Sequence, residues 1–330
     1  MSITATTPGR SILSRTKPIP TSPTRRKPTC SASSLLSHLT FTSVNMNKRF
    51  LYFSLMIFVT GCSEKIDMKL DDSHIQLSVE GTITTDSLQQ AVKLTRSAGY
   101  FSNQPAPAVS RAIVTLSDGT ATDTLREDLP ARPGTYALPQ YFRGMIGKTY
   151  SMEIKLAEPI GDHTEYSASC RIMQSVTLDS ISAIFDPSLG KEGYWQIRIF
   201  AQDPGDETNY YLFRYSRNGV LVSDSIEKWS ITDDRFFNGS YIDGLTAFYL
   251  NYSHSSETLH PGDTILVQMS AITREYYNFI LQVQQAGIQI PFFSGPPANV
   301  EGNISNGGIG FLSAYSSSRA AHVVSRPPMP

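Results

Sequence analysis

The sequence predicts a mainly β protein, in which an N-terminal β-sandwich is followed by a second antiparallel β domain that carries one α-helix. Three observations support this prediction. Short runs that alternate apolar and polar residues recur about every ten residues from His74 onward, a spacing that is typical of a β-sandwich. Turn signals rich in Gly, Pro, Asp and Asn separate the runs. A single stretch, 274–286, instead repeats its apolar residues at helical spacing.

The first domain is predicted to span residues 74–176. Its strands are expected at residues 75–83, 91–96, 112–117, 122–126, 134–138, 149–156 and 165–173. Met152, Ile154 and Leu156 fall on one face of their strand and polar residues fall on the other, so that sheet has one face in water. Strands of this number and spacing predict an immunoglobulin-like or transthyretin-like sandwich.

The longest interruption in this domain is the segment 97–109, which contains two prolines and the aromatic residues Tyr100 and Phe101. A loop of this length in a compact domain is often functional. Tyr100 and Phe101 are therefore candidates for a binding surface. The alternative is a hairpin excursion in which one aromatic ring docks on the domain.

The second domain is predicted to span residues 177–330. Asn218-Gly219 predicts a tight hairpin turn, and the stretch 233–239 is expected to be a loop. Thr273 can cap the start of the helix, and Gly287 can end it. The strands are expected at residues 181–185, 194–201, 210–217, 220–222, 248–252, 264–271 and 310–315.

The stretch 46–62 resembles a bacterial lipoprotein export signal. Lys48 and Arg49 form a positive start, and a ten-residue run follows that is apolar apart from one serine. This pattern predicts a signal peptide at 46–61, cleavage between Gly61 and Cys62, and attachment of a lipid to the Cys62 thiol. The alternative is an uncleaved signal anchor, although a bilayer span needs about 20 apolar residues.

Residues 1–45 are then expected to be an untranslated or disordered leader. They contain six basic residues, no acidic residue and many Ser, Thr and Pro residues, a composition that cannot build a core. The alternative is an organellar transit peptide, which has a similar composition. Residues 62–73 would form a charged tether between the lipid and the first strand.

The predicted mature chain is acidic. Residues 1–61 contain eight Lys and Arg and no acidic residue, so removing these eight from the total of 28 leaves 20 basic against 29 acidic residues, a net charge of −9. This balance disfavours nucleic-acid binding, for which a basic surface is expected. The lipid, and not attraction of basic residues to the bilayer, would have to hold the protein at a membrane.

The sequence contains no motif that predicts catalysis, a metal site or a cofactor: H-E-x-x-H, C-x-x-C and G-x-S-x-G are all absent. His254 and His260 lie near Glu257 and Asp263, which would make at most a weak metal site; a solvated loop is the reading that we favour. Cys170 lies in an alternating run, and we expect it to be a small buried apolar residue and not a nucleophile.

Aromatic residues are the better candidates for a binding or partner surface. Rings that point outward suit a sugar, a peptide or a partner protein. Ordinary packing and strand propensity are the alternative for most of them. In addition to Tyr100 and Phe101, the candidates are Trp229, Phe236, Phe237, Phe292 and Phe293.

Several motifs of the second domain together resemble one known family, the Bacteroidota lipoproteins called domain of unknown function 4249. The resemblance covers nearly all of the mature chain, and its most specific part is the C-terminal block. The motifs are DETNYY at 206–211, DDRFFNG at 233–239, Tyr276-Tyr277, Pro291-Phe292, Pro296-Pro297, Asn299-Val300, Gly302-Asn303-Ile304, Gly307-Gly308 and Gly310-Phe311.

The resemblance implies a lipid-anchored outer-membrane protein that faces the cell surface and is encoded beside a TonB-dependent transporter. The expected function is that of an accessory protein, which binds a small solute, glycan or peptide for the transporter or forms a lid over it. A surface adhesion or structural lipoprotein without a transporter partner is the alternative, and a hydrolase with an unrecognised site is a third. The family supplies no catalytic or binding residue that can be transferred.

Overall fold

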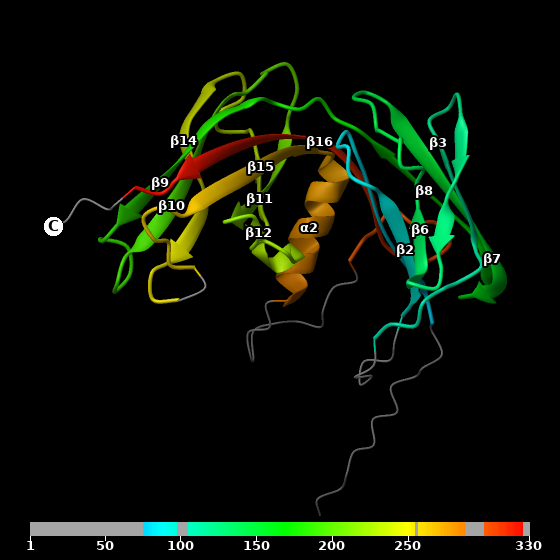
Figure 1. Cartoon of the computed structure of the whole chain (residues 1–330). Coiled ribbons are helices and arrows are strands. Elements are labelled where there is room, and N and C mark those ends of the chain that lie inside the picture. Colours follow the sequence, from blue (N-terminus) through cyan, green and yellow to red (C-terminus); the bar gives the residue numbers. More distant parts are fainter. Residues whose placement is uncertain (1–74, 98–104, 255–256, 288–299, 326–330) are drawn as a thin grey trace, which may run out of the picture. The chain divides into compact units, whose positions relative to one another are not determined.

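A computed structural model describes residues 75–97, 105–254, 257–287 and 300–325, and in these residues the predicted mainly β fold with one α-helix is confirmed (Figure 1). The strands up to residue 171 are β1 (Leu77–Thr84), β2 (Ala91–Arg96), β3 (Ile113–Ser117), β4 (Thr122–Thr124), β5 (Arg126–Asp128), β6 (Arg132–Ala137), β7 (Thr149–Ile160) and β8 (His163–Arg171). The later elements are β9 (Leu178–Asp186), β10 (Tyr194–Gln202), β11 (Tyr210–Arg217), β12 (Val220–Leu221), the 3₁₀ turn η1 (Ile226–Lys228), β13 (Ser230–Asp233), β14 (Tyr241–Asn251), β15 (Thr264–Ile272), α2 (Arg274–Gly287) and β16 (Ile309–Val323).

Two sheets enclose the first core. Strands β4, β3, β7 and β8 form one sheet, and β1, β2, β6 and β5 are neighbours in the other. Alternate residues of both sheets are fully buried in a shared core, among them Val79, Leu94, Val114 and Ile154. The alternation read from the sequence therefore produces a sandwich of two sheets with polar outer faces.

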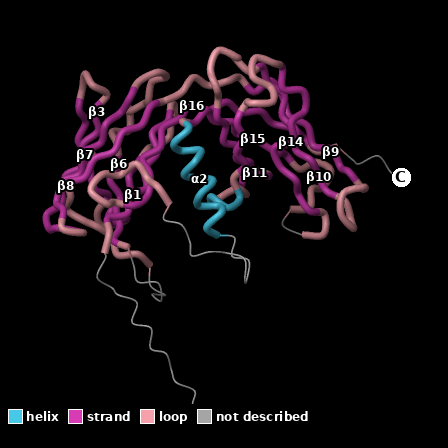
Figure 2. The backbone as a smooth tube through the Cα atoms, turned by 180° about the vertical axis from the view of Figure 1, so that it is seen from behind, coloured by secondary structure: helices cyan, strands magenta, loops and turns pink. Residues whose placement is uncertain are grey.

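Strand β16 belongs to both halves of the fold. Its first part runs parallel to β1, with Ser78 opposite Ile309 and Thr84 opposite Tyr315. Its second part pairs antiparallel with β15, with Thr264 opposite Val323. Both views show β16 passing from the β1 side of the molecule to the β15 side (Figures 1 and 2). The last described strand thus completes a sheet that contains the first described strand.

The second core lies between the sheet β14-β10-β9 and the strands β11 and β15. Ile197 of β10 and Val267 of β15 are fully buried there, and Phe213 of β11 packs with them. Asn218 and Gly219 have φ angles of 52° and 81°, and they join β11 to β12 in the predicted hairpin turn. Positive φ at both positions is what such a turn requires.

Helix α2 packs on the opposite face of β11, β15 and β16 (Figure 2). The Thr273 hydroxyl accepts a hydrogen bond from the backbone N–H of Tyr276 at 3.3 Å, so Thr273 caps the helix as predicted. Ile280 is fully buried and packs in a cluster with Leu212 and Phe311 from the strands beneath it. The helix therefore divides the outer face of the sheet into a covered part and an open part.

Three predicted strands differ most from the observed ones. The stretch 122–126 is two short strands, because β4 pairs with β3 and β5 pairs with β6; the chain changes sheets at Leu125, which is buried between them. The strand expected at 248–252 begins at Tyr241, and the strand expected at 310–315 continues to Val323. No described helix has the length and apolarity needed to cross a membrane.

Candidate functional site

The open part of this outer face forms a pocket of about 690 Å³ beside helix α2. The strand alternation makes the pocket polar: the residues of β1, β2 and β6 that do not face the first core face the pocket. Its volume falls in the usual range for small-molecule sites, about 300–1,000 Å³. The polar and charged residues on the strands that line it include Glu80, Thr82, Thr84, Lys93, Thr135 and Arg214.

The floor of the pocket is a row of paired positions across three strands. Glu80 of β1 lies opposite Lys93 of β2, and Lys93 lies opposite Thr135 of β6. Opposite charges at directly paired strand positions attract each other without needing a close contact. Neither Glu80 nor Lys93 is in an ion pair among the residues that the structure describes.

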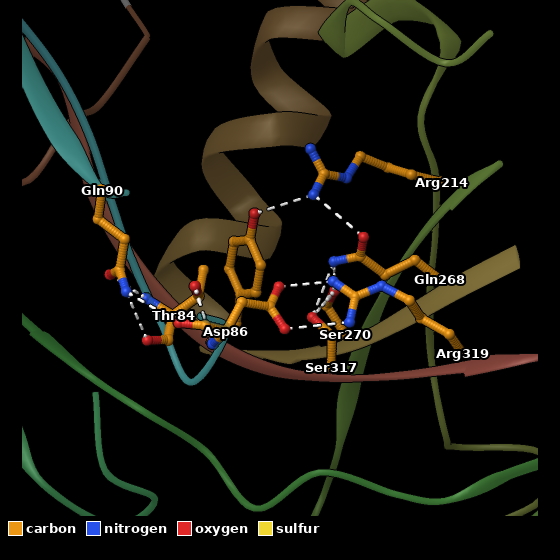
Figure 3. Close-up of polar contacts among 9 residues, drawn as sticks. Thr84, Asp86, Gln90, Arg214, Gln268, Ser270, Ser317 and Arg319 are labelled. Atoms are coloured by element: carbon orange, nitrogen blue, oxygen red, sulfur yellow. Dashed lines mark hydrogen bonds and ion pairs between the residues drawn. The ribbon is translucent and has the colours of Figure 1, made fainter. Parts of the chain in front are cut away.

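Gln90 closes the loop between β1 and β2, which lies at one end of the pocket. Its side-chain oxygen accepts a hydrogen bond from the backbone N–H of Thr84 at 2.7 Å, and its side-chain nitrogen donates to the Thr84 carbonyl at 3.0 Å (Figure 3). Gln90 is 7% exposed, so these bonds are shielded from water. The buried amide holds both ends of the loop together and fixes the position of Asp86 within it.

Asp86 forms a two-bond ion pair with Arg319 of β16. The two nitrogen–oxygen distances are 3.0 and 2.5 Å, and both side chains are partly shielded from solvent. These bonds raise the pKa of Arg319 above its ordinary value. Fork-to-fork pairing of this kind fixes geometry as well as charge. Asp86 is therefore neutralised from within the protein.

Arg214 of β11 borders the same pocket and has no acidic partner among the described residues. Its guanidinium carbon lies 5.9 Å from the centre of the Trp229 ring and 6.0 Å from the centre of the Tyr315 ring. One terminal nitrogen donates to the Gln268 side-chain oxygen at 3.4 Å and to the Tyr315 hydroxyl at 3.3 Å. The Nε atom is buried and has no hydrogen-bond partner.

A polar network holds the groups beneath Arg214 in place. The side-chain nitrogen of Gln268 donates to Ser317 at 2.8 Å and to Ser270 at 3.3 Å, and the two serine hydroxyls are 2.8 Å apart. Figure 3 shows the side chains of Arg214, Gln268 and Arg319 extending in the same direction from three neighbouring strands. Because its nitrogen is engaged, Gln268 presents its oxygen to Arg214.

Helix α2 positions the Trp229 ring. The side-chain nitrogen of Gln284 donates to the carbonyl groups of Ile226 and Trp229 at 2.8 and 3.0 Å. The indole N–H of Trp229 donates to the Ser223 carbonyl at 3.2 Å, so the ring is held from both ends. Burial raises the pKa of the neighbouring Tyr315, an effect that the Arg214 charge partly offsets, so this phenol stays neutral.

The structure places one of the aromatic residues suggested by the sequence, Trp229, beside Arg214 at the border of this pocket. Trp229 stacks near Arg214, whereas Phe237 packs against Tyr211 in the second core. Phe236 is 90% exposed. The remaining candidates lie outside the described residues: Gly61, Cys62, Tyr100, Phe101, Phe292 and Phe293.

The polar candidates of the sequence lie elsewhere. His254 lies 3.4 Å from Glu257, and His260 lies 3.8 Å from Asp263, as two separate pairs in which the histidine is exposed. In the described part of the chain no three His, Cys, Asp or Glu residues converge as metal ligands would. Cys170 is a buried apolar residue as predicted, and burial raises the pKa of its thiol to about 12.

Sequence reasoning did not identify Asp86, Gln90, Arg214 or Arg319. Each stands at a polar position of a strand or a turn, where a solvated side chain is the ordinary expectation. Arg214 carried one usable signal: it interrupts the apolar residues of β11, whose neighbours on either side are buried. A cation within such a strand needs a partner or a ligand.

In a comparison with protein families, the family model described as domain of unknown function (DUF4249) matches residues 63–321. No curated protein matches the chain. The matched range includes every residue that contributes to the pocket.

Proposed function

We propose a function from the premise that this chain belongs to the DUF4249 family. The protein is a lipid-anchored accessory of a TonB-dependent outer-membrane transporter, and it holds a small solute in the pocket formed by β1, β2, β6 and Arg214. The lipid on Cys62 keeps the pocket beside the transporter. Binding of the solute and binding to the transporter then occur at a high effective concentration.

One observation supports this proposal above the others, the pocket itself. It combines a suitable volume with lining side chains, Gln90 and Asp86, that hydrogen bonds fix before any ligand arrives. Such preorganisation lowers the cost of binding, because fewer side chains lose freedom. The groups present are charged side chains, hydroxyls and amides, all of which can hold a polar ligand. The role that we propose for the pocket is binding.

The anchor and the location in the outer membrane of a Bacteroidota cell are part of the same proposal. They rest on the export signal at 46–62 and on the family resemblance. The acidic mature chain supports a lipid as the attachment, because a net charge of −9 is repelled by an anionic bilayer surface. We also propose that the anchored protein faces the outside of the cell.

A second candidate function is adhesion to another surface or protein. Ile184 of β9 and Tyr249 of β14 stand on either side of Gln196, on the outer face of their sheet. They are 41% and 59% exposed, respectively. Exposed aromatic and aliphatic side chains on one sheet face favour a protein contact.

A pull-down from the native outer membrane in mild detergent tests the proposal. We expect a TonB-dependent barrel to co-purify with the wild-type chain and to be lost with Cys62→Ser, which cannot be lipidated. Cys170→Ala is the matched cysteine control and should retain both the lipid and the barrel. Recovery of the lipidated protein without any transporter would refute the accessory role and favour adhesion.

A further inference from the structure

We infer that the pocket binds a hydroxylated carboxylic acid, with the carboxylate of the solute on Arg214. This inference rests on the proposed function, because it names the solute class that the pocket holds. It is carried by the charge balance and the geometry of the groups around Arg214.

The charge balance leaves one positive charge of the pocket without compensation. Asp86 is paired with Arg319, and Arg132 at the rim is paired with Asp128 at 2.6 Å. The charged groups of the pocket outside these pairs are Glu80, Lys93 and Arg214. Two of these three are positive, so the unpaired charge of the pocket favours an anionic ligand.

The surroundings of Arg214 make its charge effective. Burial of the Nε atom without a partner means that part of the guanidinium has lost water and gained no hydrogen bond. The two existing bonds of the terminal nitrogen go to neutral oxygens at 3.3 and 3.4 Å, at the long end of the hydrogen-bond range. A carboxylate in the pocket would supply the charged acceptor that the protein withholds.

The aromatic rings define how that carboxylate is held. Rings near the guanidinium, from Trp229 and Tyr315, restrain its plane while leaving N–H groups free at its edge. A planar fork that is fixed in this way matches two carboxylate oxygens, which a lysine ammonium cannot do. The site therefore needs an arginine at position 214, and it selects a planar anion as its ligand.

The rest of the pocket surface selects hydroxyl groups in the solute. Thr84 and Thr135 contribute hydroxyls, and Gln89 contributes an amide. Glu80 offers carboxylate oxygens that accept hydrogen bonds from hydroxyl donors. Among the residues that line it, the apolar side chains are those of Leu88, Ala91 and Pro133, and the charged, hydroxyl and amide groups outnumber them, so a hydroxylated acid fits this pocket better than a fatty acid does.

Titration calorimetry on the full chain in mild detergent tests the inference with two probes, D-glucuronate and D-glucose, which share a ring and differ in the carboxylate. We expect D-glucuronate to bind and D-glucose to bind at least about tenfold more weakly, the ratio that a charged hydrogen bond supplies. Fluorescence gives a local readout, because Trp229 is one of only two tryptophans in the chain and lies beside Arg214.

The decisive variant is Arg214→Gln, which should weaken D-glucuronate binding about tenfold to a hundredfold. Arg171→Gln is the matched control on an exposed position of β8 and should bind as the wild type does. Arg214→Lys keeps the charge and decides the question if the glutamine variant does not fold; it too should bind more weakly, because it lacks the planar fork.

Equal binding of the two probes, no binding of D-glucuronate at millimolar concentration, or unchanged binding by Arg214→Gln or Arg214→Lys would each overturn the inference. None of these results would touch the proposed accessory role as long as the transporter still co-purifies with the wild-type protein. Loss of the transporter with intact D-glucuronate binding would have the opposite meaning: the solute class would stand, and the accessory role would fall.

Discussion

Replacing Leu312 with alanine tests whether the last strand of the chain stabilises the first sandwich. Leu312 of β16 is fully buried in the first core. Its Cδ1 atom lies 2.9 Å from the position that a Cβ atom would take on Gly81, so the leucine fills the space above that glycine of β1. Removing the side chain deletes buried apolar atoms and leaves a cavity, which costs about 2–5 kcal/mol of unfolding free energy.

Urea unfolding measures this cost. With a slope of about 1–3 kcal/mol per molar, the midpoint of Leu312→Ala should fall by on the order of 1 M. Val323→Ala in the same strand is the matched control, because Val323 is 59% exposed; its cost should stay within about 0.5 kcal/mol. Hydrogen exchange should show the loss of protection in β1 and β2. Equal midpoints for the two variants would refute the shared role of β16.

Three further predictions concern single side chains. Tyr136→Phe should cost about 1–3 kcal/mol in urea unfolding, because the buried hydroxyl bonds the Val109 carbonyl and the Ala112 amide, both at 2.9 Å; an unchanged midpoint would contradict this. Cys170, whose pKa burial raises to about 12, should resist alkylation at pH 8 until the chain is unfolded, and rapid labelling of the native protein would show that the thiol is accessible. Burial alone would raise the pKa of Glu127, but hydrogen bonds from two backbone N–H groups outweigh burial and leave the pKa below its ordinary value. The Glu127 carboxylate should therefore stabilise the fold fully above the unfolded pKa of about 4.3, and this stabilisation should decline as the pH falls below that value. In Glu127→Gln the melting temperature should fall less on acidification than it does in the wild type.

Local patterns predicted much of the fold. Alternation along 149–156 fixed which face of β7 is buried, and Met152 and Ile154 are indeed fully buried. The helix and its Thr273 cap follow from residues that are neighbours in the sequence. Features of this kind need no knowledge of distant partners, which is why one sequence reveals them.

The pairing of β16 could not be read in the same way. Its second half contains Ser316, Ser317 and Ser318, and three consecutive polar residues give no strand signal. Nothing in the stretch 309–315 indicates that its partner is β1, more than 200 residues earlier. Strand partners are set by tertiary packing, which local propensity does not encode.

The pocket depends on this same long-range pairing. Arg214 and Asp86 border the same pocket because β16 joins β15, the neighbour of β11, to β1. Arg319 reaches Asp86 from the far half of β16. Trp229 was a candidate from its residue type alone. The position of the Trp229 ring beside Arg214 depends on a hydrogen bond from Gln284 of α2 to the Trp229 backbone, and a single sequence does not reveal this contact.

The most direct test of the account is to identify what the pocket holds in its own membrane. The chain would be purified from the native outer membrane as wild type, Arg214→Gln and Arg171→Gln, and small molecules released by denaturation would be identified by mass spectrometry. We predict that a hydroxylated carboxylic acid accompanies the wild type and Arg171→Gln and is depleted from Arg214→Gln. The same set of released molecules from all three proteins would contradict the assignment of the pocket.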